Sequence, residues 1–286
     1  LLQSYVLEAH RPHNLESLAA RHLDRKGLSY EDVCGKGANQ IPFAQVELAR
    51  AAEYSGEDSE MTLHVHQHLW PLLQAEPTLA GVLTDIGTFG AGYRLSGWKR
   101  PVLVSSADGV GTKLKIAFMM DKHDTIGADL VNHCVNDIAV LGAEPLFFLD
   151  YLGTGKLEPH VFTEIIRGFA RACAENNCAL IGGETAQMPG FYQKGEYDVS
   201  GTIVGVVEKR RMLNGQKTVT AGDAVIGIAS SGLHTNGYSL ARSVLFDRYE
   251  VDDFVDELGA RVGDALLAVN LHHNLGDELA KMDKEL

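Results

Sequence analysis

The spacing of apolar residues divides the chain into a helical first part and a longer part in which strands and helices are mixed. Leu15, Leu18 and Leu23, preceded by Asn14, have the spacing and the N-terminal cap of a short amphipathic helix. Residues 43–73 carry the same helical periodicity over a much longer stretch. The first part of the chain is therefore predicted to be helical.

Short apolar runs separated by amphipathic stretches make up the rest. Val102–Val104 is a run of β-formers that leads directly into the hexapeptide DGVGTK. A stripe of apolar residues at helical spacing predicts a helix over 124–142. By the same criteria, further strands are predicted at 145–151, 179–181, 197–209 and 224–229, and further helices at 158–176 and from about Tyr238.

The DGVGTK hexapeptide is the first candidate for chemistry. Gly109 and Gly111 let the backbone approach a ligand closely, and amides of such a turn can hold phosphate oxygens. Thr112 adds a hydroxyl, Lys113 a positive charge, and Asp108 a carboxylate for the divalent ion that accompanies a nucleotide. The spacing is not that of the P-loop, so the alternative is a strand-ending turn with a solvated lysine.

The predicted helix over 124–142 carries a polar row beside its apolar stripe. Asp129 and Asn136 are two turns apart and share a bearing to within about 20°. His133 and Asp137 lie between them and the apolar stripe. Such a row fits residues that reach into a cleft, and the alternative is a solvated helix flank.

Two further segments place polar groups next to predicted strands. Glu184 follows a Gly-Gly pair at the end of the 179–181 strand, where it is either a metal ligand or an ordinary turn carboxylate. The loop SSGLHTNGY brings hydroxyls, His234 and Asn236 in front of a helix, which suits a sugar-phosphate. His234 is either a proton-transfer group or a histidine that only donates a hydrogen bond.

Composition limits the possible partners. The 286 residues suffice for two domains, and a formal net charge of −13 argues against a general affinity for nucleic acid. No apolar run approaches the roughly 18 residues of a membrane helix, and the N-terminal LLQSYVLEAH lacks the basic start of a signal peptide. The cysteines have no CxxC spacing, so we expect reduced thiols in a cytoplasmic protein without a membrane partner.

Several of these motifs occur together in one enzyme family. The stretches concerned are TDIGTFG, PVLVSSADGVGTKLKIA, HDTIGADLVNHCVNDIAVLGAEPLFFLDY, GGETAQMPGFY, YDVSGTIVGVVEK and SSGLHTNGYSLAR. In their order and spacing, residues 78–269 resemble phosphoribosylformylglycinamidine cyclo-ligase, also called aminoimidazole ribonucleotide (AIR) synthetase. The resemblance implies an α/β (α+β) fold, with a mixed or antiparallel sheet and packed helices in the first domain.

The resemblance also implies a reaction, in which formylglycinamidine ribonucleotide and ATP give AIR, ADP and phosphate, with ATP and Mg²⁺ as cofactors. It assigns the nucleotide and its phosphates to Asp108, Gly109, Gly111, Thr112, Lys113, Asp129, Asn136 and Asp137. It assigns the metal to Asp108, Asp129 and Glu184. It assigns the substrate to His234, Thr235 and Asn236. It assigns catalytic roles to His234 and Lys113.

The family pattern further predicts how the chain is organised. Residues 78–221 correspond to the ATP-binding first domain, which in the family forms a homodimer by packing sheet against sheet. Residues 222–269 correspond to the start of a second α/β domain that is truncated, and 270–286 to a helical tail outside the family pattern. Because so much of the second domain is missing from the pattern, we expect turnover in this form to be absent or low.

The helical first part resembles a different family. Residues 1–77, through LLQSYVLEAHRPHNLESLAARHL and EYSGEDSEMTLHVHQHLWP, are similar to part of the 3′–5′ exonuclease domain of bacterial DNA polymerase I. Tyr54 and Asp58 match its YxxxD motif, in which the Asp binds a metal. The other acidic motifs are absent from the sequence, so we expect a helical fragment without nuclease activity. The alternatives to a cyclo-ligase are a DNA-binding or exonuclease-related fragment, or a non-functional chimera.

Overall fold

The computed structural model describes residues 11, 14–75, 81–83 and 90–271. It divides the chain into two compact units, Leu1–Ala80 and Gly81–Leu286. In the described residues the first unit is helical, whereas the second contains a four-stranded sheet covered by helices.

The first unit begins with α2 (Leu15–Leu23), as predicted. The Asn14 side chain caps it by accepting a hydrogen bond from the backbone N–H of Ser17 at 2.7 Å. After α3 (Tyr30–Cys34) and the 3₁₀ turn η1 (Gly37–Asn39), the chain reaches α4 (Leu48–Ala75). Leu18 of α2 packs with Val65 and Leu69 of α4 in a small apolar core.

The predicted start of the long helix at residue 43 is wrong. Phe43–Gln45 instead forms a separate 3₁₀ turn, η2, which ends at Val46 in an extended conformation. An extended residue interrupts the helical hydrogen-bond ladder, so α4 cannot begin before that point.

The sheet of the second unit is mixed, as the resemblance implied. Its strands are β1 (Pro101–Gly109), β2 (Glu144–Thr154), β3 (Ala179–Gln187) and β4 (Tyr197–Glu208), in the order β1-β4-β2-β3. β4 pairs antiparallel with both β1 and β2, whereas β2 and β3 are parallel. The parallel pair is possible because a helix, α7 (Pro159–Glu175), connects the two strands.

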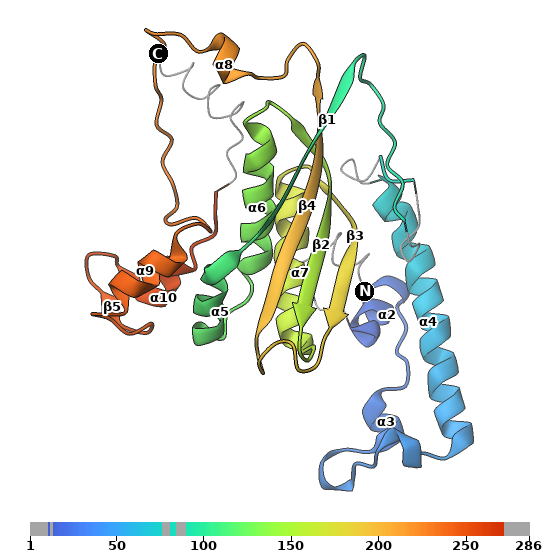
Figure 1. Cartoon of the computed structure of the whole chain (residues 1–286). Coiled ribbons are helices and arrows are strands. Elements are labelled where there is room, and N and C mark those ends of the chain that lie inside the picture. Colours follow the sequence, from blue (N-terminus) through green and yellow to red (C-terminus); the bar gives the residue numbers. More distant parts are fainter. Residues whose placement is uncertain (1–10, 12–13, 76–80, 84–89, 272–286) are drawn as a thin grey trace. The chain divides into compact units, whose positions relative to one another are not determined.

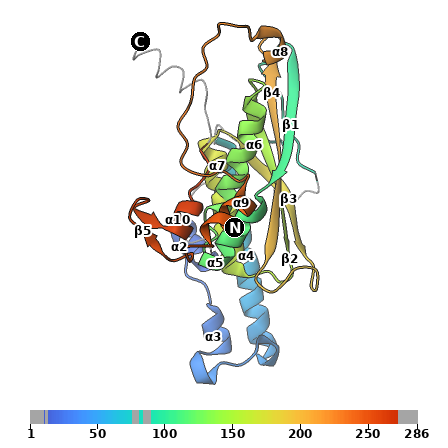
Figure 2. The same cartoon turned by 60° about the vertical axis from the view of Figure 1, so that its left-hand side comes forward.

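One face of the sheet is covered by α6 (Ile126–Ala139) and α7 (Figures 1 and 2). Ile138 and Phe169 of these helices are fully buried together with Phe148 of β2. The two helices approach closely at Gly127 and Gly168, where each glycine leaves room for the backbone of the other helix. The helices predicted over 124–142 and 158–176 are therefore confirmed with slightly shorter ends.

The remaining elements of the second unit are short. The 3₁₀ turn η4 (Gly111–Lys113) leads from β1 into α5 (Leu114–Met120). After α8 (Gly215–Thr218) come α9 (Tyr238–Leu245), the hairpin of β5 (Phe254–Val255) and β6 (Ala260–Arg261), and α10 (Val262–Leu266). Both views show α9 and α10 beside α5 (Figures 1 and 2).

Several strand predictions need correction. β1, β2 and β3 run beyond the predicted ranges, and β3 continues to pair with β2 as far as Gln187. The strand predicted at 224–229 is wrong: no described strand pairs with this segment, and Val225 is 99% exposed. An apolar run forms a stable strand only where a neighbour satisfies its backbone groups.

Two other predictions concern the chain as a whole. Among the described residues no helix is both long and apolar enough to cross a membrane. All the cysteines are free thiols with buried side chains, at Cys34, Cys134, Cys173 and Cys178. Most of TDIGTFG and all but Asn270 and Leu271 of the predicted 270–286 tail lie outside the described residues.

Candidate functional site

The DGVGTK hexapeptide occupies the end of β1 and the turn that follows it. Gly111 has a φ of +67°, a left-handed conformation in which a side chain is strained. A Cβ on Gly109 would lie 3.2 Å from the carbonyl oxygen of Val199, so β1 and β4 are close at this point. The turn therefore requires glycine at Gly111, whereas a side chain at Gly109 would need β4 to shift by a few tenths of an ångström; the turn directs the chain from β1 into η4.

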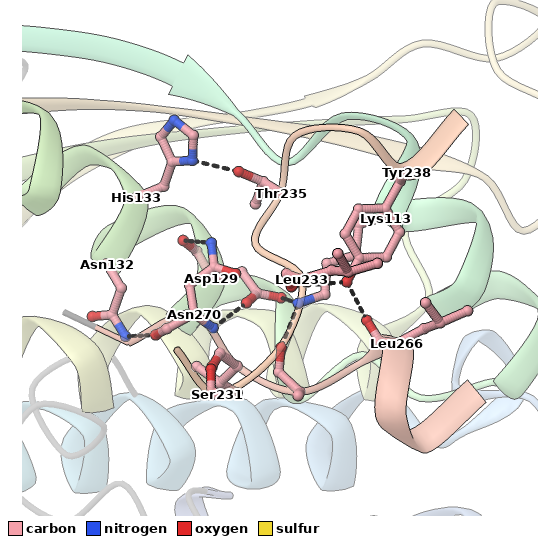
Figure 3. Close-up of polar contacts among 12 residues, drawn as sticks. Lys113, Asp129, Asn132, His133, Ser231, Leu233, Thr235, Tyr238, Leu266 and Asn270 are labelled. Atoms are coloured by element: carbon pink, nitrogen blue, oxygen red, sulfur yellow. Dashed lines mark hydrogen bonds and ion pairs between the residues drawn. The ribbon is translucent and has the colours of Figure 1, made fainter. Parts of the chain in front are cut away.

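The side chain of Lys113 is buried in the protein interior next to this turn and does not extend into solvent. Its side chain is fully buried, and its ammonium is 2.8 Å from a carboxylate oxygen of Asp129, itself fully buried (Figure 3). The same ammonium donates a hydrogen bond to the carbonyl of Ala268 at 2.6 Å and lies 5.6 Å from the centre of the Tyr238 ring. The solvated lysine considered as the alternative for this motif is therefore excluded.

Asp129 is enclosed from its other side by the last described residues. Its second carboxylate oxygen accepts the backbone N–H of Asn270 at 2.8 Å. Burial raises the pKa of Asp129 and lowers that of Lys113, while the attraction between the two charges opposes both shifts. Asn132, one turn further along α6, donates to the carbonyl of Asn270 at 2.7 Å (Figure 3).

A second polar cluster lies at the open side of the turn. The ring of His133 in α6 contacts a carboxylate oxygen of Asp108 through Nε2 at 2.7 Å. Its other nitrogen, Nδ1, forms a hydrogen bond with the hydroxyl of Thr235 (Figure 3). Asp137 lies 4.0 Å from the same Nε2 and accepts a hydrogen bond from Ser106 at 2.7 Å. The imidazole thus connects the end of β1 to the loop before α9.

That loop, residues 230–237, is held at several points. Ser231 donates to the carbonyl of Val269 at 2.7 Å, and Ser230 forms a hydrogen bond with Nε2 of His234 at 3.0 Å. The hydroxyl of Tyr238 lies 2.5 Å from the carbonyl of Leu266. Ser239, at the start of α9, contacts the hydroxyl of Thr112 at 3.1 Å. The loop is therefore fixed against both η4 and α10.

The structure brings together some of the predicted site residues and separates others. Asp108, Asp137 and Thr235 gather around His133, and the amide of Asn136 donates to the carbonyl of Leu271 at 2.9 Å. Glu184 is distant from this cluster. Its pairing partners place it three strand spacings from Gly109, about 14 Å at about 4.8 Å per spacing.

Two features of the predicted metal ligands therefore need correction. Glu184 lies inside β3 and not beyond its end, because β3 continues to pair with β2 past the Gly-Gly pair. Asp108 is about half exposed, whereas Asp129 is fully buried with both oxygens occupied. In this conformation Asp108, Asp129 and Glu184 do not converge on one ion.

The described residues contain a different set of potential ligand atoms. Those of Asp108, His133 and Asp137 lie within 4.8 Å of one another. Mg²⁺ prefers oxygen ligands and imidazole favours transition metals. The two carboxylates therefore fit Mg²⁺, with His133 as a neighbour that orients Asp108.

Sequence reasoning did not assign a role to His133 or to Asn270. The sequence places His133 only in a polar row, and a histidine beside two carboxylates becomes informative once their positions in space are known. Asn270 lies 141 residues from Asp129, to which its backbone N–H donates. No local pattern signals a contact over that separation.

Comparison with known families finds two matches in different parts of the chain. Residues 91–207 match the family described as AIR synthase related protein, N-terminal domain. Residues 1–74 match the 3′–5′ exonuclease family. The two matches correspond to different compact units of the structure.

Curated relatives extend the first match. A phosphoribosylformylglycinamidine cyclo-ligase of Thermoanaerobacter pseudethanolicus is 59% identical over 196 residues, which are 68% of this chain and 58% of the relative. Another, of Syntrophotalea carbinolica, is 54% identical over 217 residues, 74% of this chain and 61% of the relative. The chain thus spans little more than half the length of these relatives.

Solved structures give weaker similarities. Thiamine-monophosphate kinase from Stenotrophomonas maltophilia has a TM-score of 0.37 and 20% identity, covering 50% of this chain and 42% of the kinase. The hydrogenase maturation protein HypE of E. coli has a TM-score of 0.38 and 15% identity, covering 54% of this chain and 48% of HypE.

The family matches and the curated relatives together confirm both resemblances predicted from the motifs. The second unit is similar to AIR synthetase, and the first is similar to a 3′–5′ exonuclease domain.

Proposed function

We propose that residues 81–271 act in a cytoplasmic, ATP-dependent cyclo-ligase of purine biosynthesis that forms AIR from formylglycinamidine ribonucleotide. One observation carries this proposal: Asp108 of the nucleotide motif and Thr235 of the substrate loop contact the same imidazole, that of His133. Nucleotide and substrate must be held together for this reaction, and His133 joins the segments assigned to them. The free cysteines support a reducing compartment.

The chemistry requires activation of a poor leaving group. The formyl oxygen attacks the γ-phosphorus of ATP and ADP departs. An internal nitrogen then attacks the activated carbon, loses a proton and closes the imidazole ring as phosphate leaves. Positioning and charge stabilisation supply most of the catalysis in such a reaction. His234 is the proposed proton acceptor, and its hydrogen bond to Ser230 orients the ring.

The remaining roles follow from position. The turn at Gly109, Gly111 and Thr112 would hold phosphate oxygens through the backbone N–H groups of Gly111 and Thr112 and the hydroxyl of Thr112, while the N–H of Gly109 donates to the carboxylate of Asp108 at 2.7 Å. Thr235 and Asn236, next to His234, hold the substrate. Asp108 and Asp137 would hold Mg²⁺, which neutralises charge on the phosphates when it is bound.

Lys113 has a different position from the one expected of a phosphate ligand. Its ammonium is occupied by Asp129 and by the carbonyl of Ala268. We assign it the task of fixing η4 against α6 and against the last described residues. Direct contact with a phosphate requires the Lys113–Asp129 pair to open.

The uncovered face of the sheet supports the proposed homodimer. Leu103 of β1 is 62% exposed, whereas its neighbour Val104 is buried. Covering an exposed apolar side chain removes apolar surface from water, which is favourable. A second copy packed on this face would cover Leu103. Sedimentation analysis of wild type and Leu103→Glu measures whether the substitution disrupts this dimer.

Nucleotide binding is the property to test first. Asp108→Ala should weaken Mg·ATP binding at least tenfold in calorimetry, because it removes a carboxylate from the proposed cation site. Asp256→Ala, which removes an exposed carboxylate elsewhere, is the matched control. Equal affinities for wild type and Asp108→Ala would contradict the assignment. AIR formation from formylglycinamidine ribonucleotide and ATP then measures the complete reaction.

A further inference from the structure

A hollow of about 330 Å³ lies at the end of the sheet where β1 begins and β4 ends. It is lined by Gly97, Trp98, Lys99, Glu208, Arg210 and Arg211. Figure 1 shows β1 and β4 side by side, with the opposite end of β1 leading to α5. This hollow is thus at the other end of β1 from Asp108, about 23 Å away at about 3.3 Å per strand residue.

The hollow is strongly basic in a chain of net charge −13. Its lining and immediate neighbours supply five exposed cations, at Lys99, Arg100, Lys209, Arg210 and Arg211. None of them forms an ion pair with a residue that the structure describes. Adjacent positive charges repel one another, so an anion bound here would relieve that repulsion.

The only carboxylate in the lining is already occupied. Glu208 accepts the backbone N–H of Lys99 at 2.5 Å and that of Arg100 at 3.2 Å. These hydrogen bonds lower the pKa of Glu208, with Arg210 and Lys99 contributing. Glu208 therefore ties two backbone segments together, and its single charge offsets only part of the positive charge of the surrounding cations.

The segments that carry the cations have a fixed separation. Lys209 donates its backbone N–H to the carbonyl of Arg100 at 3.0 Å, continuing the β1–β4 pairing beyond the strands. The backbone N–H of Arg211 donates to the carbonyl of Glu208 at 2.7 Å. The guanidinium groups thus extend from a short, hydrogen-bonded turn.

We propose that this hollow binds a nucleoside polyphosphate, with phosphates on Arg210 and Arg211 and the base on the ring of Trp98. A guanidinium group can donate two parallel hydrogen bonds to the oxygens of a phosphate, and the indole ring can stack on a nucleobase. A volume of about 330 Å³ lies at the lower end of ligand pockets. This site is separate from the nucleotide position at Asp108, and it does not depend on the cyclo-ligase proposal.

The emission of Trp98 provides the test. The chain has two tryptophans, so Trp70→Phe leaves Trp98 as the only reporter. The probe is ATP in EDTA, because the proposed site at Asp108 requires a divalent cation. We expect saturable quenching that weakens as salt is raised. No quenching up to millimolar ATP would overturn the proposal.

Three variants in that background identify the site. Arg210→Gln/Arg211→Gln should weaken ATP binding at least tenfold, whereas Lys194→Gln/Arg248→Gln, which removes two exposed charges elsewhere, should change it less than twofold. Asp108→Ala should have no effect. Quenching that survives in the arginine variant, or disappears in Asp108→Ala, contradicts the proposal. Circular dichroism verifies that each variant is folded.

Inorganic tripolyphosphate separates the two parts of the ligand. It should displace ATP but bind at least fivefold more weakly, because it lacks a base for Trp98. Equal affinities would show that the hollow recognises phosphate alone and would overturn the assignment of the base to Trp98.

Discussion

At the scale of single residues, the Lys113–Asp129 pair dominates the candidate site. Both side chains are fully buried, and each has a further backbone partner, the carbonyl of Ala268 for Lys113 and the N–H of Asn270 for Asp129. A buried charge is tolerated only when it is paired and hydrogen-bonded. The pair therefore determines where the last described residues lie relative to α6.

Removing one member of the pair should be strongly destabilising. Lys113→Met leaves Asp129 buried without its counter-charge, so we expect a loss of about 3–5 kcal/mol in the free energy of unfolding. Lys113→Met/Asp129→Asn should recover part of that loss, because no unpaired charge remains. Lys122→Met, which breaks a partly exposed pair with Asp264, should cost less than about 1 kcal/mol.

Urea unfolding followed by tryptophan fluorescence measures all three variants. If the free energy of unfolding of Lys113→Met stays within about 1 kcal/mol of the wild-type value, the Lys113–Asp129 ion pair does not stabilise the fold.

Asp150 makes a pH-dependent contribution. It lies in β2, paired with Gly183 of β3, and burial raises its pKa to about 6. A carboxyl with a pKa higher in the folded than in the unfolded chain disfavours folding once it ionises. Stability should therefore fall as pH rises from about 4 to about 6.

Asp150→Asn cannot ionise, so its stability relative to wild type should increase between pH 4 and pH 7 by about 1–3 kcal/mol. Thermal unfolding at several pH values measures this difference. Asp256→Asn, at an exposed carboxyl, should show no such trend. A pH-independent difference for Asp150→Asn would mean that its carboxyl is effectively solvated.

Sequence reasoning identified several of the residues in the candidate site but not their environments. The sequence motifs predict Asp108, Asp137 and Thr235 as site residues, and the structure brings them around one imidazole. The burial of Lys113 was not foreseeable, because its partner Ala268 is 155 residues away. Local spacing indicates which groups share a helix face or a turn, but contacts between distant segments depend on tertiary packing.

At the scale of elements, the helices were predicted more accurately than the strands. α6 and α7 have complete apolar stripes and were located to within about three residues. β1 and β3 extend through polar and glycine-rich residues, Ser105–Gly109 and Gly182–Gln187, because neighbouring strands satisfy their backbone groups. Conversely, residues 224–229 are apolar but have no described partner.

The contact between α6 and α7 provides a prediction at this scale. A Cβ on Gly168 would lie 3.0 Å from the backbone nitrogen of Ala128 and 3.0 Å from the Cα of Gly127. Helix propensity alone predicts that alanine stabilises the helix, but this overlap should make the substitution destabilising. Gly168→Ala should lower the free energy of unfolding by about 1–3 kcal/mol.

Gly56→Ala is the matched control, because Gly56 lies inside α4 with open space around it. There the same substitution should stabilise by about 0.5–1 kcal/mol. Differential scanning calorimetry compares the two variants. Stabilisation by Gly168→Ala would show that α6 and α7 leave more room at Gly168 than these distances allow.

At the scale of the whole molecule, two compact units match two unrelated families. Leu18, Val65 and Leu69 form a core within the first, whereas Phe148 and Phe169 belong to the core of the second. Each unit thus has an apolar core and a family match of its own. The cyclo-ligase proposal and the exonuclease match therefore concern different units, and each can be tested with substitutions in its own unit.

The first unit should not trim DNA despite its match to an exonuclease family. Tyr54 and Asp58 are one turn apart in α4, and burial, together with the neighbouring carboxylate of Asp58, raises the pKa of Tyr54. Among its described residues, no three His, Cys, Asp or Glu side chains bring ligand atoms within 4.8 Å of one another. Hydrolysis by two metal ions about 4 Å apart requires several converging carboxylates.

We therefore expect no metal-dependent shortening of a 3′-labelled single strand in Mg²⁺ or Mn²⁺. Asp58→Ala distinguishes this chain from a contaminating nuclease, because any trimming by a contaminant would persist in that variant. Trimming by wild type that disappears in Asp58→Ala would contradict the prediction. It would mean that Asp58 shares a metal with carboxylates outside the described residues, and the helical unit would then be an active nuclease rather than a fragment that retains one of its motifs.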